Sequence, residues 1–426
     1  MTSRTALTLV LPMVLGACGP VELRARDGAC ASETYDFSAV DTFLTQSIAL
    51  FDGNVLVMIL KDGAPIYQFQ LGAIGPDTVV HMASATKLIS AGVILSVVDA
   101  GNFALDDRVG DYVPAMQAAG KGDITIRQCF SMTSGLFGGL MYEINPLLTL
   151  EQSVDRIAQF TPIVFPPGTQ MAYDGAGMQV AGLAAQNATG VGWRLLAAQR
   201  LFAPLQMAST SYTEFGLNPA VAGGVRTSAN DYLRYLQMVL DGGVWEGQRI
   251  LSPEAIAEIF TNQSYGLPIY HLPPGFAGGS PWFPYGAETI WYGFGAWVLA
   301  RNPVSGRVEE ITSPGAWGSF AWIDRRRGIV GMLVTDVPAG SAQAVDPALH
   351  AFELIRQAID RAVLGDLNCD GCIDFNDIEP FVVALAGEAA YEQAYPSCRY
   401  LQADCNRDGG VDFADVDAFV AQLARG

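Results

Sequence analysis

Residues 84–100 read SATKLISAGVILSVVDA, and this stretch decides the fold of the chain. The run from Lys87 to Ala100 is almost entirely apolar, which predicts a buried helix. Ser84 lies three positions before Lys87, so a helical start brings the hydroxyl and the amine to one face, within hydrogen-bond reach. Burial would favour the neutral amine, which can take the proton of the serine. The alternative reading of Ser84 is a simple helix N-cap.

Lysine is rare in this chain, and that makes the position of Lys87 informative. Only three lysines occur, because arginine is used almost everywhere else. Lys61 and Lys121 stand beside glycines in predicted turns, whereas Lys87 opens a helix. The N-terminus of that helix would also favour an oxyanion developing at Ser84. The pair is therefore a candidate nucleophile and proton acceptor.

Length and composition restrict the class of protein. The chain has 426 residues, a net charge of −19, half of its residues hydrophobic and 16% charged. An acidic chain repels phosphate backbones, so no nucleic acid is expected as a partner, and so apolar a chain is not disordered. The length suggests one large domain or two unequal ones. After the first twenty positions no run of about 18 uncharged apolar residues occurs, which argues against an interior transmembrane helix.

The N-terminus has the features of an export signal. Arg4 precedes an apolar stretch from Ala6 to Leu15, which is too short to span a membrane. Small residues before Cys18 resemble the lipobox of bacterial lipoproteins, in which that cysteine carries the lipid. Ordinary cleavage nearby and an uncleaved segment are the alternatives. We expect a signal peptide over 1–17, a tether over 18–33 and a periplasmic, cell-surface or secreted protein, with membrane contact only through a lipid on Cys18.

The remaining six cysteines fit an oxidising compartment. Four of them crowd into the last sixty residues, so we expect the tail to be held by disulfides and the body not. Six cysteines allow 15 pairings, and the sequence does not choose between them. Cys129 lies in the apolar run Ile126–Phe130 and is expected to be a buried free thiol.

The body, 34–364, alternates between strand and helix patterns. Two β-rich runs around Lys61-Asp62-Gly63 predict a hairpin, and later runs at 295–300, 319–323 and 329–335 predict further strands. Between them the pattern is mostly helical. Strands at both ends of a helical middle imply an α+β body in which early and late strands share one antiparallel sheet. A last helix, capped by Asp346 and begun by Pro347, should pack on that sheet.

The tail, 365–426, contains an internal repeat. The segment 366–377 returns 38 positions later, each copy with oxygen-bearing side chains at loop positions 1, 3, 5, 9 and 12. This is the calcium-loop spacing of an EF-hand, and it predicts two Ca²⁺ sites. The alternative, a pair of Asx-rich turns, would not explain why both copies carry oxygen-bearing side chains at the same loop positions. The candidate ligands are Asp366, Asn368, Asp370, Cys372, Asp374 and Asp377, then Asp404, Asn406, Asp408, Gly410, Asp412 and Asp415. Aspartate at position 12 and a single exit helix resemble dockerin-type repeats, which implies a protein partner for the tail. Phe375 and Phe413 depart from that pattern and leave cohesin docking in doubt.

Several segments around Ser84 resemble one family when they are taken together. They are Leu105-Asp106-Asp107 leading to Tyr112-Val113-Pro114, Ile124–Arg127 running into Ser131–Leu136, and Phe165–Thr169 preceding Tyr173. In this order and spacing they resemble the serine β-lactamase-related family of class C β-lactamases, D-alanyl-D-alanine carboxypeptidases and S-x-x-K carboxylesterases. The resemblance covers Ser38 to Ala362. It implies a penicillin-recognising serine hydrolase fold, with Ser84 as acylating nucleophile, Lys87 as proton shuttle and Tyr173 as assisting phenol.

Two departures from the family pattern bear on the substrate. The second motif, usually Y-x-N, reads Tyr173-Asp174-Gly175, so the amide is absent. The third motif, usually Lys-Thr-Gly or His-x-Gly, corresponds to Ser313–Gly318 and holds no cation, although Gly315 is kept. The N–H of Ala316 can still join that of Ser84 in an oxyanion hole.

The resulting pattern favours an ester or a small amide, so the expected partner is a small-molecule ester, amide or peptide substrate. It would be attacked through an acyl-enzyme and without a catalytic cofactor. The alternative is a weak or inactive scaffold that binds cell-wall or protein partners. A Ser-His-Asp mechanism is disfavoured, because the chain has three histidines but no G-x-S-x-G elbow. The aromatic stretch from Tyr265 to Trp291 is either a pocket wall or an ordinary surface loop.

Overall fold

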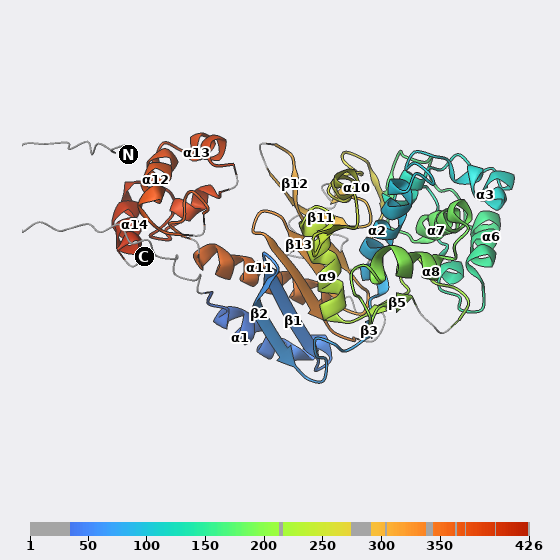
Figure 1. Cartoon of the computed structure of the whole chain (residues 1–426), viewed down its shortest axis with the longest axis horizontal. Coiled ribbons are helices and arrows are strands. Elements are labelled where there is room, and N and C mark those ends of the chain that lie inside the picture. Colours follow the sequence, from blue (N-terminus) through green and yellow to red (C-terminus); the bar gives the residue numbers. More distant parts are fainter. Residues whose placement is uncertain are drawn as a thin grey trace, which may run out of the picture. The chain divides into compact units, whose positions relative to one another are not determined.

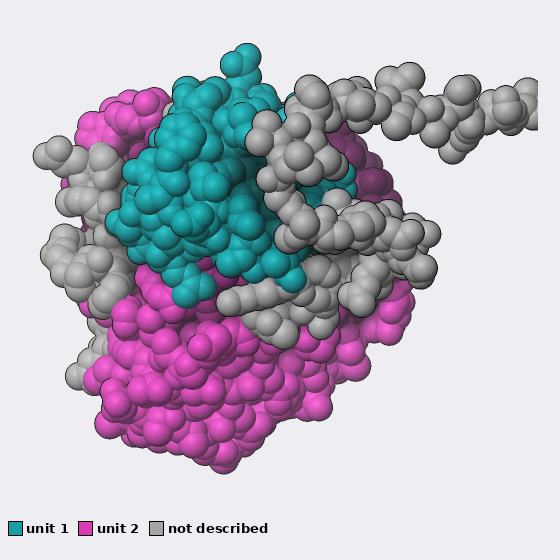
Figure 2. Space-filling model, turned by 90° about the vertical axis from the view of Figure 1, so that its left-hand side faces the viewer, with its two compact units in different colours: residues 1–33, 365–426 teal, residues 34–364 magenta. Residues whose placement is uncertain are grey.

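A computed structural model describes residues 35–212, 216–273, 291–302, 305–337, 344–362, 364–370, 372–396 and 398–424. The signal peptide, the tether, Cys18 and Cys30 predicted from the sequence lie outside these residues. The chain divides into two compact units, one reaching Leu364 and the other beginning at Gly365. Figure 2 colours them separately, and each is described below by itself. No helix within the described residues is long and apolar enough to cross a membrane.

The larger unit is organised around a seven-stranded antiparallel sheet. Its strand order is β10-β11-β12-β13-β14-β1-β2. Strand β14, the last in the sequence, therefore pairs with β1, the first. This confirms the expectation that early and late strands share one sheet. The strands are β1 (Val55–Lys61), β2 (Ala64–Leu71), β10 (Trp291–Tyr292), β11 (Trp297–Arg301), β12 (Val308–Pro314), β13 (Phe320–Asp324) and β14 (Ile329–Val334).

The predicted hairpin is present, and its turn explains its register. Asp62 and Gly63 both have positive φ, 50° and 79°, which is the two-residue turn that matches the twist of antiparallel strands. Lys61 pairs with Ala64 across it. In contrast, strand β12 was not predicted, because Glu309 and Glu310 interrupt its apolar pattern.

Helices cover both faces of this sheet (Figure 1). The final helix α11 (Val345–Ala362) packs on β13, where Phe352 contacts the rings of Phe320 and Trp322, as the sequence predicted. It begins at Val345, so Asp346 and Pro347 lie within its first turn and are not its cap and first residue. Helix α1 (Ser38–Gln46) lies beside α11. Helix α9 (Ala229–Leu240) packs on β13 and β14. The result is a three-layer arrangement whose core is buried between helices and sheet.

The long middle of the chain forms a helical lobe beside the sheet, as expected (Figure 1). At its centre α2 (Thr86–Asp99) is buried along almost its whole length. Cys129 is buried in this lobe with a free thiol, which confirms its prediction. The remaining helices of this middle stretch are α3 (Pro114–Ala118), α4 (Ile126–Phe130), α5 (Leu140–Glu143), α6 (Leu150–Phe160), α7 (Ala176–Thr189), α8 (Trp193–Ala197) and α10 (Pro253–Ile259). The short strands of the unit are β3 (Val80–His81), β4 (Met171–Ala172), β5 (Ser211–Tyr212), β6 (Val225–Thr227), β7 (Val244–Trp245), β8 (Gln248–Arg249) and β9 (Ile269–His271).

The smaller unit has its own core and a disulfide. Its helices are α12 (Ile378–Leu385), α13 (Glu388–Ala394) and α14 (Val416–Leu423), with stacked Phe381 and Phe419 rings between two of them. Cys369 is bonded to Cys398, so the tail is held by a disulfide as expected, while Cys405 is a buried free thiol. One exit helix follows each repeat, α12 after the first and α14 after the second.

A buried ion network fixes α11 to the sheet. Arg327 lies in the β13–β14 turn and contacts Glu310 at 2.9 Å, Asp324 at 2.5 Å and Asp360 at 2.8 Å. Arg356 contacts the second oxygen of Glu310 at 2.6 Å. Burial and the neighbouring Asp324 raise the pKa of Glu310 to about 7 in spite of both arginines. In this network the close ion pairs offset the free-energy cost of taking the charged side chains out of water.

Arg327→Met should destabilise the larger unit by about 3–5 kcal/mol, because it leaves the carboxylates of Glu310 and Asp324 buried without their main cation. Arg307→Met, at an exposed position between β11 and β12, is the matched control and should change stability little. Urea unfolding at neutral pH measures both. Equal stabilities of the two variants would show that the network contributes nothing.

Candidate active site

Ser84 lies where strand β3 gives way to helix α2. The turn passes through Ala83, whose φ of 44° is unusual for a residue with a side chain and marks local strain. Ser84 is half-buried in a short 3₁₀ turn, Ala83–Ala85, and the following helix starts at Thr86 without a side-chain cap. The N-cap interpretation of Ser84 is therefore wrong, and its hydroxyl is available for other contacts.

Lys87 reaches Ser84 as predicted. Its Nζ donates to Ser84 Oγ at 3.0 Å and to the main-chain oxygen of Ala222 at 3.0 Å. The lysine side chain is 5% exposed, so these two bonds hold the amine in a nearly water-free place. The candidate nucleophile and the candidate proton acceptor are thus in direct contact, an arrangement that can activate a serine hydroxyl.

Tyr173 completes the group of three. It follows β4, its N–H donates to His271 O at 3.0 Å, and its ring stacks on Trp297 with centroids 5.0 Å apart. Lys87 Nζ lies 4.8 Å from the centre of the same ring, a distance at which a cation is attracted to an aromatic face. Of the aromatic stretch 265–291, residues 274–290 lie outside the described part, but β9 borders Tyr173 through its pairing with β4.

The turn between β12 and β13 borders Ser84 from the sheet. A Cβ built on Gly315 would lie 2.2 Å from Met82 O, so only glycine lets this turn approach the segment before the nucleophile. Ser313 Oγ donates to Ser84 O at 3.3 Å. Ala316 is exposed, and its N–H makes no hydrogen bond to any described residue. The structure therefore brings Ser313 and Gly315 against the segment Met82–Ser84, and Ala316 follows directly in the same turn.

A buried amide network supports the carbonyl that holds Lys87. Gln179 on α7 donates to Asn218 Oδ1 at 2.6 Å and accepts the N–H of Val221 at 2.9 Å. Asn218 also donates to Glu143 O on α5 at 2.9 Å. These bonds fix the loop that carries Ala222 O. Because all of these groups are buried and paired, the loop has little freedom to move.

Glu143 is a buried acid beside this site that the sequence analysis missed. Its side chain is 4% exposed, and a Cβ built on Gly175 would lie 2.0 Å from its Oε2. Burial, and then the charge of Asp174, raise the pKa of Glu143 to about 8, while the charge of Lys87 opposes them. The one signal in the sequence was Gly175 itself, which leaves space where the family pattern has a side chain.

The structure places the other candidates elsewhere. His81 packs edge-on against Trp317, with ring centroids 4.9 Å apart, as expected for a residue at a strand end. Lys121 caps helix α6 through Ala158 O and Thr161 O, both at 2.6 Å.

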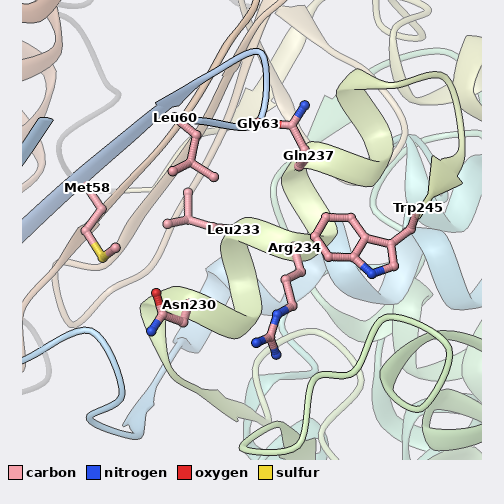
Figure 3. Close-up of a pocket in the computed structure, with 8 residues that line it drawn as sticks. All are labelled: Met58, Leu60, Gly63, Asn230, Leu233, Arg234, Gln237 and Trp245. Carbon is pink, nitrogen blue, oxygen red and sulfur yellow. The ribbon is translucent and has the colours of Figure 1, made fainter. Parts of the chain in front are cut away.

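A cavity of about 210 Å³ between β1 and α9 is lined by Met58, Leu233 and Trp245 among others (Figure 3), and none of the three predicted catalytic residues lines it.

The two tail loops fold alike. In each, the position-5 N–H donates to the position-3 asparagine at 2.8 Å, as Asp370 does to Asn368 and Asp408 to Asn406. The position-12 aspartates, Asp377 and Asp415, are buried and accept main-chain N–H groups of their own loops. Cys372 and Gly410, at position 7, donate to the preceding aspartates. Across the described residues, no three His, Cys, Asp or Glu side chains are gathered as a metal centre.

Comparisons with known proteins agree with this fold. A family model described as Beta-lactamase matches residues 52–354. Penicillin-binding protein 4 of Amycolatopsis lactamdurans is 27% identical over 223 residues, which cover 43% of this chain and 57% of that relative. The chain thus spans little more than half of that curated relative.

Two solved structures resemble the larger unit. One, from Bacteroides dorei DSM 17855, is 27% identical with a TM-score of 0.67, covering 77% of this chain and 100% of that one. The other is EstCE1, described as a hydrolase with promiscuous acyltransferase activity, at 19% identity and a TM-score of 0.59, covering 76% of this chain and 97% of that one. At that identity the second likeness concerns the fold alone.

The raised pKa of Glu143 predicts a pH-dependent stability. In the native state Glu143 keeps its proton up to a pH of about 8. In the unfolded state it loses the proton near pH 4.5, the ordinary pKa of a glutamate. This contribution to stability is complete below 4.5 and is lost as pH rises through 8. Glu143→Gln, neutral at every pH, should therefore gain Tm over the wild type at about pH 9 and little at about pH 4.5.

Thermal melts of both proteins at the two pH values check this prediction. Glu151→Gln, at an exposed position of α6, serves as the control and should show the same small difference at both. A Tm gain of Glu143→Gln that does not grow with pH would contradict the assignment.

Proposed function

The chain belongs to the beta-lactamase family, and on this basis we propose that it is a serine hydrolase that cleaves an ester or a small amide through an acyl-enzyme on Ser84. The observation that carries the proposal is the position of Lys87 Nζ, 3.0 Å from Ser84 Oγ in a nearly water-free place. An amine there can accept the serine proton while Oγ attacks the carbonyl carbon. No resident cofactor is part of this chemistry.

The remaining groups would share the other steps. Lys87 would return the proton to the leaving alcohol or amine, and the phenol of Tyr173, over whose ring the amine lies, would assist proton transfer to the deacylating water. The N–H groups of Ser84 and Ala316 would receive the oxyanion, since Gly315 holds that turn against Met82. Ser84, Lys87, Tyr173 and Ala316, which would carry these roles, all lie in the described part of the chain.

The substrate side of the site favours esters. A penicillin presents a carboxylate and an acyl amide, but Ser313 offers no cation and Gly175 offers no amide. A minimal ester needs only the nucleophile, the oxyanion hole and an apolar wall, which the half-buried ring of Tyr173, stacked on the buried Trp297, would provide. The same two gaps motivate the alternative, a weak or inactive scaffold that binds cell-wall or protein partners.

For the tail we propose two calcium sites and a protein partner. Each loop offers carboxylate, amide and main-chain oxygens, which is the donor set that Ca²⁺ prefers. Asp366, Asp370, Asp374 and Asp377 would hold one ion with Asn368, and Asp404, Asp408, Asp412 and Asp415 the other with Asn406; Cys372 and Gly410 would add main-chain oxygens. The ion would bring together carboxylates that otherwise repel one another.

The place of action is also a proposal. An export signal over 1–17 and a lipid on Cys18 would put the protein in the periplasm, on the cell surface or outside the cell. The disulfide between Cys369 and Cys398 is consistent with an oxidising compartment. Nucleic acid is not a proposed partner, because the chain is strongly acidic.

Ser84→Ala and Lys87→Ala should each abolish hydrolysis of short-chain aryl esters without unfolding the protein, because serine and amine act as one unit. Tyr173→Phe keeps the stack on Trp297 and should lose most of the rate. Steady-state kinetics with thermal melts measure these effects. Ser84→Ala retaining full esterase activity would overturn the mechanism.

Turnover of β-lactams should be weaker than turnover of the best ester by at least about tenfold, or roughly 1.4 kcal/mol of transition-state binding. The reason is the missing cation and the missing amide at positions 313 and 175. A chromogenic cephalosporin and a series of aryl esters test this on the purified protein. Equal efficiency on both would contradict the substrate assignment, and no turnover of either would favour the scaffold.

Calcium should bind the full-length protein at two sites, with a Kd of roughly 10⁻⁴ to 10⁻³ M as in extracellular modules. Asp404→Ala should remove one site and Asp366→Ala the other, whereas Asp417→Asn, exposed and outside the loops, should remove none. Isothermal titration measures the stoichiometry of each variant. Absence of calcium uptake by the wild type at millimolar concentration would refute the calcium sites.

A further inference from the structure

Glu143 is a buried acid next to the catalytic group that the proposed mechanism does not use. It ends helix α5, its side chain is 4% exposed, and its Oε1 has no hydrogen-bond partner among the described residues. The carboxyl is not isolated, because a hydrogen bond with the Asp174 side chain contributes to its raised pKa. A buried polar oxygen without a partner is nevertheless costly, so it is retained where it has a task or is compensated. The residues that surround the Glu143 carboxyl, Gly175 and the loop that carries Ala222, indicate its task.

The space for this carboxyl is made by Gly175. The backbone there has φ −98° and ψ −9°, which any residue can adopt, so conformation does not require a glycine. A Cβ at that position, however, would lie 2.0 Å from Glu143 Oε2 and 2.8 Å from the Cβ of Ala222. The glycine therefore leaves room for the Glu143 carboxyl at the edge of the Ala222 loop.

Glu143 and Lys87 are fixed to the same loop. Asn218 donates to Glu143 O at 2.9 Å, and four residues later Ala222 O accepts Lys87 Nζ at 3.0 Å. Two charged groups act on Glu143: Lys87 from α2 and Asp174 from the segment before α7. Asp174 is itself held by the N–H groups of Gly138 and Ala176. Carboxyl and amine are thus held by one framework.

We propose that Glu143 is a positioning residue for Lys87, and that its carboxyl takes, in the space left by Gly175, the place of the polar side chain that the second motif lacks. The inference rests on the proposed function, because it assigns a task to the amine that activates Ser84. Burial raises the pKa of Glu143 to about 8, so at neutral pH the group keeps its proton. Such a carboxyl both donates and accepts hydrogen bonds, as a primary amide does, and puts no full charge beside the amine.

Ionisation of Glu143 should then impair the site. An ionised Glu143 would compete with Ser84 Oγ for the hydrogen bonds of the Lys87 amine, because charge-assisted hydrogen bonds are the stronger ones. Activation of Ser84 in the wild type should therefore fall as pH rises through about 8. This fall separates positioning from a merely structural role when thermal melts over the same pH range show that the wild type stays folded.

The test measures the rate at which a fluorophosphonate probe labels Ser84, by mass spectrometry, together with ester hydrolysis across pH. Glu143→Ala should slow labelling by roughly 10- to 100-fold, as expected for a misplaced catalytic group. Glu143→Gln should stay close to the wild type at neutral pH and lack the fall above about 8. Glu151→Gln, exposed on α6, is the matched control and should behave as the wild type.

A double-variant comparison tests the role of Gly175. Gly175→Ala pushes on the flexible end of Glu143, so it should slow labelling in the wild type and have a much smaller effect when Glu143 is already alanine. Equal effects in both backgrounds would show that the glycine serves only its contact with Ala222. Glu143→Gln keeps the side-chain volume, so the pH profile remains decisive even where Glu143→Ala fails to fold.

The outcomes separate this inference from the proposed function. If Glu143→Ala and Glu143→Gln keep the labelling rates, pH profiles and ester hydrolysis of the wild type, the positioning role alone is overturned. Labelling of Ser84 that depends on Lys87 and Glu143, without turnover of any ester or amide, would support the positioning role and overturn the hydrolase proposal. A wild type that the probe does not label at Ser84 would overturn both.

Discussion

The amine of Lys87 is held between the hydroxyl of Ser84 and the main-chain oxygen of Ala222, 3.0 Å from each, in a place that water hardly reaches. An amine can be buried only where its hydrogen bonds are supplied, so this contact constrains everything around it. Helix α2 must begin immediately after the serine, and the loop before Gly223 must approach it from the opposite side. The architecture of the larger unit meets both requirements.

Other buried polar groups maintain these positions over the whole unit. Gln179 and Asn218 tie the Ala222 loop to helices α7 and α5, while Arg327 ties α11 to the sheet that carries the Gly315 turn. Paired polar groups contribute modestly to stability but allow few alternative arrangements. The site therefore owes its geometry to a framework of directional bonds within an otherwise apolar core.

Local chemistry made much of this predictable from the sequence. The turn at Asp62-Gly63 specifies its hairpin, and Ser84 and Lys87 lie only three positions apart at the start of a helix, so both features follow from neighbours in the chain. Strand β12 escaped prediction because Glu310 looks like a surface residue until Arg327 and Arg356 are seen beside it. Glu143 and Ala222 escaped for a similar reason: Ala222 binds Lys87, and Glu143 feels its charge, only through the tertiary fold. The missing asparagine at Gly175 was visible, but the group that fills its space was not.

The central claim is that Ser84, activated by Lys87, carries the acyl group. It is tested most directly by mixing the full-length protein with an activated ester, quenching in acid and locating the acyl adduct by peptide mapping. The account predicts one adduct, on Ser84, which appears in the wild type and is absent when Lys87 is replaced by alanine. An adduct on another residue, or one on Ser84 that forms as fast without the lysine, would contradict it.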